Sequence, residues 1–500
     1  MLFRSRHPSG LYTLFFTEMW ERFSYYGMRA LLVLYLVNAL EYPRSDALEV
    51  YATYTALVYL TPVLGGYLAD RWLGARRAVL VGAILMALGH FAMAAPALLY
   101  LALGLLVAGN GFFKPNISTM VGALYARDDP RRDSGFTIFY MGINLGAFFS
   151  PLVCGTLGEK LGWHYGFAAA GVGMLAGLGV VAWGQRFLGR VGLPASRTQD
   201  EPRLTVQDWK LVGVVTLLTL ALVYAVINIW PLFAPWWDSL GVGARVSLGL
   251  STAVAIGVTP RLVRRLLRSA APQRVARTPD APPPKLTRVD IERIAAIFIM
   301  ATFVVFFWMG FEQAGGTMNL FADKLTDRTI HGWEIPATYF QSVNPLLILL
   351  LAPLFSMLWV RLDQSRFALS SVTKQAIGMI ILGMGFVVLA IAQQRADLLG
   401  KVGPGWLLLV YLLHTTGELC LSPIGLSMVT RLAPVHLVSL MMGMWFTAMA
   451  LANYLAGTLE AMLHGSDIPL YWFLVASSMG AGVLLLLLSP LIRRLMHGVR

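Results

Sequence analysis

Seven ionisable side chains lie deep within long apolar stretches of the 500-residue chain. Charges at membrane depth are costly and normally face a partner or an aqueous cavity, so each marks a candidate functional site. The seven residues are Glu18, Glu21, Arg22, Arg29, Lys114, Glu312 and Glu418. Because four are acidic and three are basic, one negative charge has no matching cation, and we expect one carboxylate to bind a proton readily.

The first apolar stretch carries six polar residues on one side of the expected helix. They are Glu18, Glu21, Arg22, Tyr25, Tyr26 and Arg29. At about 100° per residue they fall within an arc of about 140°. This stripe predicts a helix face that is turned toward the interior of the protein.

Separated charges of opposite sign predict a site for a small zwitterion. A cavity that contains Arg29 and Lys114 together with Glu312 and Glu418 can hold both ends of such a molecule. Six aromatic residues can shape side-chain pockets in it: Tyr25, Tyr26, Tyr59, Tyr140, Trp308 and Trp445. The alternative is that the charges form structural ion pairs and that each aromatic ring packs between helices.

The composition indicates that membrane-spanning helices position these residues. Hydrophobic residues make up 57% of the chain and charged residues 13%, against about 25% charged in soluble domains. A net charge of +13 would by itself suit a nucleic-acid partner, but the mean hydropathy of +0.66 favours the lipid bilayer, and we expect no nucleic acid. Cys154 and Cys420 both lie in apolar stretches, without the spacing of a metal site.

A bilayer core of about 30 Å needs about 20 apolar residues per helix. The sequence predicts fourteen such transmembrane helices, near residues 11–38, 47–70, 76–97, 99–125, 135–158, 164–188, 208–230, 240–260, 290–319, 336–360, 369–393, 404–432, 436–463 and 468–492. The weakest is 240–260, which contains Arg245 and could instead lie on the membrane surface.

The distribution of Lys and Arg predicts that both termini are cytoplasmic. On this layout 29 of the 39 basic residues fall at the termini or in the loops on their side, and six fall in the opposite loops. Cytoplasmic loops carry such an excess. If 240–260 did not cross the membrane, all later basic loops would face outward, so the bias supports this span.

Two stretches rich in Pro, Arg and Ser, 190–207 and 261–288, interrupt the apolar pattern. They predict three domains: an N-terminal six-helix bundle (1–189), cytoplasmic linkers with two inserted transmembrane helices (190–288), and a C-terminal six-helix bundle (289–500).

Ordered motifs then resemble one family along nearly the whole chain. Segment 18–27, EMWERFSYYG, resembles the ExxERFxYYG motif of the proton-dependent oligopeptide transporters, the peptide transporter branch of the major facilitator superfamily. Segments 70–76 (DRWLGAR) and 139–146 (FYMGINLG) resemble its DRxxGxR and FYxxINxG motifs. The segments GFFKPN, FFWMGFEQ, FQSVNP, GELCLSPIGLS and MMGMWF follow in the order that the family has. The resemblance implies an all-α major facilitator fold of bacterial type, with two extra helices between the bundles.

The resemblance also implies a function: a symporter that imports dipeptides and tripeptides by alternating access, with the proton gradient as its energy source and no cofactor or bound metal. The proton-coupling residues would be Glu18, Glu21, Arg22, Lys114 and Glu312. The peptide-binding residues would be Tyr25, Tyr26, Arg29, Tyr59, Lys114, Asn144, Trp308, Asn344, Glu418 and Trp445, with Glu418 at the amino terminus of the peptide and Arg29 and Lys114 at its carboxylate. The gating residues would be Arg29, Glu312 and Asp70, and Glu312 would pair with Arg29 on the outer side when the cavity closes to the exterior. Phe311 departs from members that have a second carboxylate there, which leaves the proton stoichiometry open.

We therefore expect a monomeric, multi-pass protein of the bacterial inner (plasma) membrane that handles small peptides and protons. One alternative is a transporter of the same fold with another substrate, such as a drug exporter or an anion carrier, although a simple anion has no need of Glu418. A membrane enzyme or a sensor is the other alternative. The sequence shows no nucleophile with a base and no metal cluster, so we expect that the protein is not an enzyme.

Overall fold

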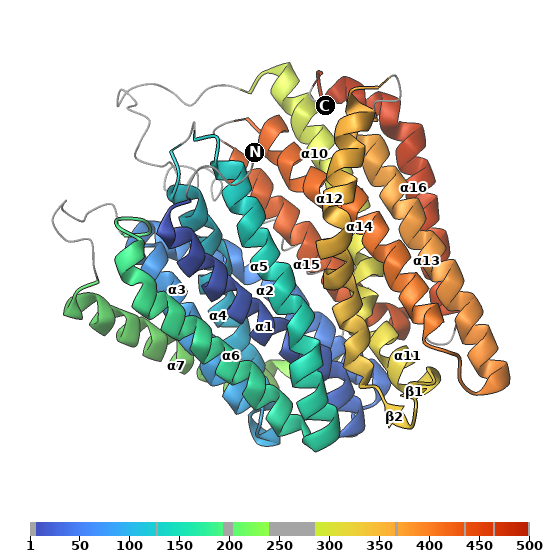
Figure 1. Ribbon diagram of the computed structural model, residues 1–500, viewed down its shortest axis with the longest axis horizontal. Coiled ribbons are helices and arrows are strands. Elements are labelled where there is room, and N and C mark those ends of the chain that lie inside the picture. The colour runs from blue at the N-terminus through green and yellow to red at the C-terminus, as the bar shows by residue number, and fades with distance from the viewer. Residues whose placement is uncertain are drawn as a thin grey trace.

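The computed structural model of the protein describes residues 7–126, 129–193, 204–239, 286–365, 369–434, 437–463 and 466–498. Long helices run side by side through the whole molecule (Figure 1). In the first part of the chain the structure has α1 (Ser9–Asn38), α2 (Arg44–Leu68), α3 (Ala75–Ala92), α4 (Leu99–Ala123), α5 (Arg132–Thr156), α6 (Trp163–Trp183) and α7 (Val206–Asp238). After residue 285 it has α10 (Arg288–Phe311), α11 (Thr317–Leu325), α12 (Val343–Asp363), α13 (Ser371–Leu399), α14 (Gly405–Leu432), α15 (Val438–Leu463) and α16 (Leu470–Leu495).

Short turns of other helical types join or extend these helices. They are η1 (Ala69–Leu73), η2 (Pro96–Leu98), η3 (Leu157–Leu161), η4 (Gly184–Phe187), η5 (Glu312–Gly315) and η6 (Ala337–Ser342). Between η1 and α3 the chain passes through Gly74 at φ 75°, a conformation that favours glycine because it has no Cβ. Gly74 therefore allows the sharp turn between η1 and α3.

Eleven helices within the described residues are long and apolar enough to cross a membrane. α1 and α14 are not among these eleven, and α1 carries four buried charges. Both are nevertheless long enough to cross a membrane, because they have 30 and 28 residues, or at least about 40 Å at 1.5 Å per residue. Every predicted span except 240–260 coincides with a described helix; that span and most of both predicted linkers lie outside the described residues. The prediction of an all-helical membrane protein is confirmed.

The span predicted at 290–319 is interrupted. α10 ends at Phe311, η5 forms a tight turn over 312–315, and α11 begins at Thr317. Gly315 and Gly316 lie at this break. Glycine destabilises a helix by about 1 kcal/mol relative to alanine, so these two residues favour an interruption of the helix here. The loop that follows forms a small hairpin of β1 (Thr329–Ile330) and β2 (Trp333–Glu334). Its two central residues, His331 and Gly332, both have positive φ, as a type I′ turn requires.

The helices of the first part pack mainly on one another, as do those of the second. α1 contacts α5 and α6, α3 contacts α4, and α13 contacts α14 and α16. Between the two parts, α2 packs on α15 and α5 packs on η6 and α12. α1 begins and α16 ends at the same end of the molecule (Figure 1), although the side of the membrane on which this end lies stays a prediction, as do the predicted domain boundaries.

The described inserted helix, α7, packs on α3 and α4. Arg77, at the start of α3, forms an ion pair with Asp208, which also accepts a hydrogen bond from the backbone N–H of Thr205 at the N-terminus of α7. Val212 of α7 is buried, whereas Leu217 and Leu222 are exposed. α7 is thus attached to the first part of the chain by one face, and its opposite face is apolar, as contact with lipid requires.

Candidate functional site

The polar face of α1 forms a buried charge cluster, as its spacing predicted. Arg22 Nε lies 2.9 Å from Glu18 Oε1 and 2.5 Å from Glu21 Oε2, and Asn110 Nδ2 of α4 donates to Glu21 Oε1 at 3.4 Å. All three charged side chains are almost fully buried. Two carboxylates therefore share one guanidinium group.

One carboxylate of this cluster can readily take up a proton. Glu18 Oε2 is buried and accepts no hydrogen bond from the described residues. A buried carboxylate oxygen without a donor is costly, and two carboxylates beside one cation repel each other. Both costs fall when one carboxylate is protonated. The chemistry of the cluster therefore suits proton uptake, although its part in coupling stays a prediction.

Lys114 lies near the same cluster, at electrostatic range of Glu18 and Glu21. Its Nζ is 4.3 Å from the centre of the Tyr59 ring, the geometry of a cation–π contact. Pro115 follows it inside α4. Lys114 does not line the cavity described next, so its predicted contact with a substrate carboxylate stays a prediction.

A cavity of about 260 Å³ lies between the two parts of the chain. This volume is near the lower end of the roughly 300–1,000 Å³ of small-molecule sites. Its wall comes from α1, α2, α5, α10, η5, η6, α12, α14 and α15. Ten residues that the sequence predicts for the site line it: Tyr26, Arg29, Tyr59, Tyr140, Asn144, Trp308, Glu312, Asn344, Glu418 and Trp445. Residues from helices up to about 400 positions apart in the chain thus meet at one site.

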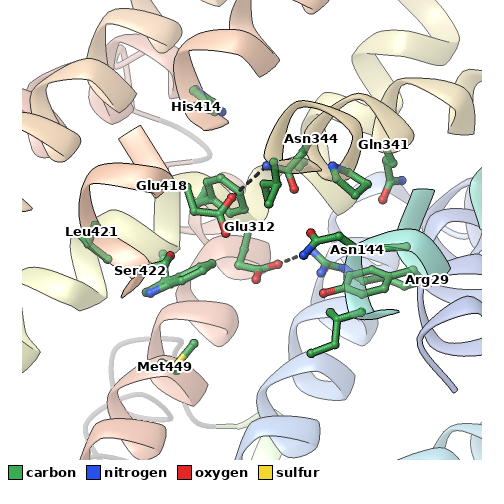
Figure 2. A pocket seen from close by; sticks show the side chains of 18 of the residues that line it. Arg29, Asn144, Glu312, Gln341, Asn344, His414, Glu418, Leu421, Ser422 and Met449 are labelled. Atoms are coloured by element: carbon green, nitrogen blue, oxygen red, sulfur yellow. Dashed lines mark hydrogen bonds and ion pairs between the residues drawn. The ribbon is translucent and has the colours of Figure 1, made fainter. Parts of the chain in front are cut away.

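Arg29 and Glu312 form an ion pair at the edge of this cavity, between α1 and η5 (Figure 2). Arg29 Nε also donates a hydrogen bond of 2.7 Å to the hydroxyl of Tyr51 on α2. A Cβ atom at Gly315 would lie only 1.8 Å from this hydroxyl, so only glycine fits there. The break between α10 and α11 thus makes room for the contact that joins Arg29 to its partners.

Glu418 is the acidic residue of the cavity without a cation. Its Oε2 accepts a hydrogen bond of 2.9 Å from Asn344 Nδ2, which also donates to Thr415 Oγ1 at 3.0 Å. No basic side chain of the described residues lies within ion-pair distance of it. Figure 2 shows Glu418 and Asn344 on one side of Glu312, with Arg29 and Asn144 on the other. The site therefore offers an unpaired anion apart from its guanidinium.

Polar and aromatic residues complete the wall. Asn144 Nδ2 donates to the Tyr140 carbonyl on its own helix, at 3.0 Å, which leaves its side-chain oxygen as an acceptor. Trp445 is buried against Gly425, where a Cβ would lie 2.6 Å from the indole ring. Tyr25 does not line the cavity: it is buried beneath Arg22 and packs edge-on against Tyr26.

Asp70, the third predicted gating residue, lies far from this group, in η1. It forms no ion pair with the side chains that the structure describes. Arg76 and Arg77, which follow in the chain, interact with other residues. Arg76 donates hydrogen bonds to the carbonyls of Gly189 and Val191, and Arg77 forms an ion pair with Asp208. The gating role of Asp70 stays a prediction.

The structure adds lining residues that sequence reasoning did not single out. Gln341, Tyr411 and His414 all line the cavity, and Gln341 Nε2 is buried without a partner in the described part of the chain. Spacing could have found all three, because Gln341 lies three residues before Asn344, and Tyr411 and His414 lie seven and four residues before Glu418. Residues three, four or seven apart share one face of a helix.

Known proteins are similar to this chain along nearly its whole length. The model of the POT family matches residues 76–205 and 284–471. The chain is similar to the peptide transporter YePEPT of Yersinia enterocolitica, with 38% identity over 99% of this chain and 96% of that protein. It is also similar to the di-/tripeptide transporter of Lactococcus lactis, with 32% identity over 99% and 97%.

Among solved structures, the chain is similar to the peptide transporter POT in complex with sulfate. The identity is 35%, the TM-score is 0.79, and 98% of this chain and 96% of the other are covered. A POT family transporter in complex with 5-aminolevulinic acid gives 30% identity, a TM-score of 0.79 and 97% coverage of both chains. The family model covers more than half of the sequence and these relatives span nearly all of it, and the chain therefore belongs to the POT family.

Proposed function

We propose that this protein is a proton-coupled symporter that imports dipeptides and tripeptides by alternating access. One observation carries the substrate class: the cavity holds the unpaired carboxylate of Glu418 apart from the guanidinium of Arg29. A peptide ammonium group can pair with Glu418, and a peptide carboxylate can compete with Glu312 for Arg29. A simple anion would leave Glu418 without a partner.

The relatives support the same substrate class. Two of them carry the names peptide transporter and di-/tripeptide transporter. A third was solved with 5-aminolevulinic acid, a small molecule that also has an amino group at one end and a carboxylate at the other. The aromatic wall of Tyr26, Tyr59 and Trp308 suits side chains of varied size.

The energy supply is sufficient for accumulation. One inward positive charge yields about 2.3 kcal/mol per 100 mV, and one unit of pH difference adds about 1.4 kcal/mol. A few kcal/mol supports a concentration ratio of roughly a hundredfold. The buried cluster of Glu18, Glu21 and Arg22 is the group that we assign to proton binding. We also propose that the protein works as a monomer, as expected from the sequence.

The test is uptake of radiolabelled dialanine into proteoliposomes with an imposed inward proton gradient. We expect accumulation that an uncoupler abolishes. In Glu418→Gln the ammonium group loses its ion pair, so dialanine should bind about tenfold to a hundredfold more weakly, the range that 1.4–3 kcal/mol corresponds to. N-acetyl-dialanine, which has no ammonium group, should bind the wild type weakly and be little affected by the substitution.

Glu292→Gln is the matched control, since Glu292 is a carboxylate of α10 that pairs with Arg288 and does not line the cavity. It should behave as the wild type does. A folded wild type that neither takes up dialanine nor binds any dipeptide or tripeptide would refute the proposal in favour of a non-peptide carrier.

A further inference from the structure

A second contact between the two parts of the chain runs along α5, apart from the Arg29–Glu312 pair. α5 lies beside α12 (Figure 1) and packs on η6, the turn that leads into it. Thr156 Oγ1 lies 2.8 Å from the Tyr339 hydroxyl, and Ser342 Oγ donates to the Phe148 carbonyl at 2.8 Å. Hydrogen bonds thus join α5 and η6 over about two turns of α5.

Glu159, in η3 just after α5, makes the strongest of these contacts. Its Oε2 accepts a hydrogen bond of 2.7 Å from the backbone N–H of Ala337. Its Oε1 accepts bonds of 3.0 Å from the backbone N–H of Thr338 and 2.7 Å from the Thr338 hydroxyl. The first N–H groups of a helical turn have no partner within the turn, and hydrogen bonds to a charged acceptor are stronger than neutral ones.

The surrounding surfaces are shaped for this contact. A Cβ at Gly155 would lie 1.9 Å from Thr338 Oγ1, so glycine lets η6 approach the helix. Arg328 adds charge: it lies 3.6 Å from Glu159 and 3.1 Å from Glu334. Ordinary packing of apolar side chains needs no such convergence of donors on one carboxylate.

These contacts belong to one end of the molecule. Within the described residues, the side-chain hydrogen bonds between the parts before 240 and after 285 lie at the cavity or toward the end opposite the termini. Examples are the Asn319 amide with the Ala30 carbonyl and Arg44 with Glu460. The structure is therefore closed at that end, and the contacts must break before the cavity can open there.

We propose that Glu159 is a gating residue that holds the end opposite the termini closed. Its carboxylate binds the backbone N–H groups of Ala337 and Thr338 in the closed state and releases them to water when α5 and η6 separate. This proposal rests on transport by alternating access, but it concerns the equilibrium between two conformations rather than the identity of the substrate.

The experiment measures the distance between spin labels on either side of the contact. Leu161 of η3 and Ile330 of β1 are both exposed and are replaced by cysteine for labelling; the native Cys154 and Cys420 are buried, and protein without the new cysteines should take up no label. We expect the wild type to show mainly the short distance. In Glu159→Gln, an amide N–H faces the backbone N–H groups, so the ratio of long to short distances should rise about tenfold.

Three further variants make the result specific. Asp327→Asn removes a carboxylate that accepts a hydrogen bond from the backbone N–H of Thr329 in its own loop, and its distances should match those of the wild type. Thr338→Val removes one donor and should give a smaller shift, and Glu159→Asp should restore part of the closed state. Equal distances in Glu159→Gln and the wild type would refute the gating role. A shift of distances in a protein that transports no peptide would refute the proposed function alone.

Discussion

Among single residues, Glu21 has the surroundings that proton coupling demands. It is fully buried, shares Arg22 with Glu18, and receives a hydrogen bond from Asn110. Glu21→Gln keeps the size of the side chain and cannot take up a proton in the same pH range. We expect proton-driven accumulation of dialanine to fall at least tenfold while exchange across the membrane persists, because the substitution leaves the cavity wall unchanged.

The measurement compares gradient-driven uptake with counterflow in the same proteoliposomes. Glu292→Gln serves again as the carboxylate control. If Glu21→Gln abolished counterflow as well, then Glu21 would be needed for binding or for folding, and the assignment to coupling would be wrong.

At this scale the spacing of residues predicted partners within a helix, whereas the one pair expected across helices, Glu312 with Arg29, came from the family resemblance. These two residues form an ion pair in the structure. The spacing of Glu18 and Arg22 places them one turn apart, and they pair as expected. By contrast, the contacts of Arg29 with Tyr51 and of Glu418 with Asn344 join separate helices. Membrane helices are apolar around most of their circumference, so periodicity does not fix the rotation of one helix against another.

Among the elements, the break between α10 and α11 is the feature that the sequence did not predict. Hydropathy is averaged over about 19 residues, so a turn of four residues at Glu312–Gly315 leaves the average high. The pair Gly315-Gly316 was the available signal. The break positions Glu312 against Arg29, and it therefore matters for the site as well as for the fold.

Gly315→Ala tests the need for this close approach. The added Cβ would lie 1.8 Å from the Tyr51 hydroxyl and 3.1 Å from Arg29 Nε, so we expect a loss of about 1–3 kcal/mol of stability, as in overpacked cores. Thermal unfolding in detergent measures it. In a Tyr51→Phe background, which lacks the hydroxyl, the same substitution should cost clearly less.

Gly480→Ala is the control for the methyl group itself, because nothing lies within 4 Å of a Cβ at that helical position in α16. It should leave the unfolding temperature unchanged or raise it slightly. Equal unfolding temperatures for Gly315→Ala and Gly480→Ala would contradict the argument for a tight contact at the break.

For the whole molecule, the charge bias of the loops predicts the orientation in the membrane. The structure shows which end of the molecule is closed. α1 begins and α16 ends at one end (Figure 1), and the contacts at Glu159 and Arg44 close the other end. If both termini are cytoplasmic, the closed end faces the outside. The contacts at that end would then block entry of substrate from outside.

Labelling of single cysteines in intact cells tests this orientation. Arg493, near the end of α16, and Lys401, between α13 and α14, are both exposed and lie at opposite ends of these helices. We expect a membrane-impermeant maleimide to label Lys401→Cys in intact cells, and Arg493→Cys only after the cells are opened. The physical reason is that loops rich in Lys and Arg are retained on the cytoplasmic side during insertion. The reverse pattern would place the Glu159 contact on the cytoplasmic side, so that the closed end of this structure would block release of substrate instead of entry.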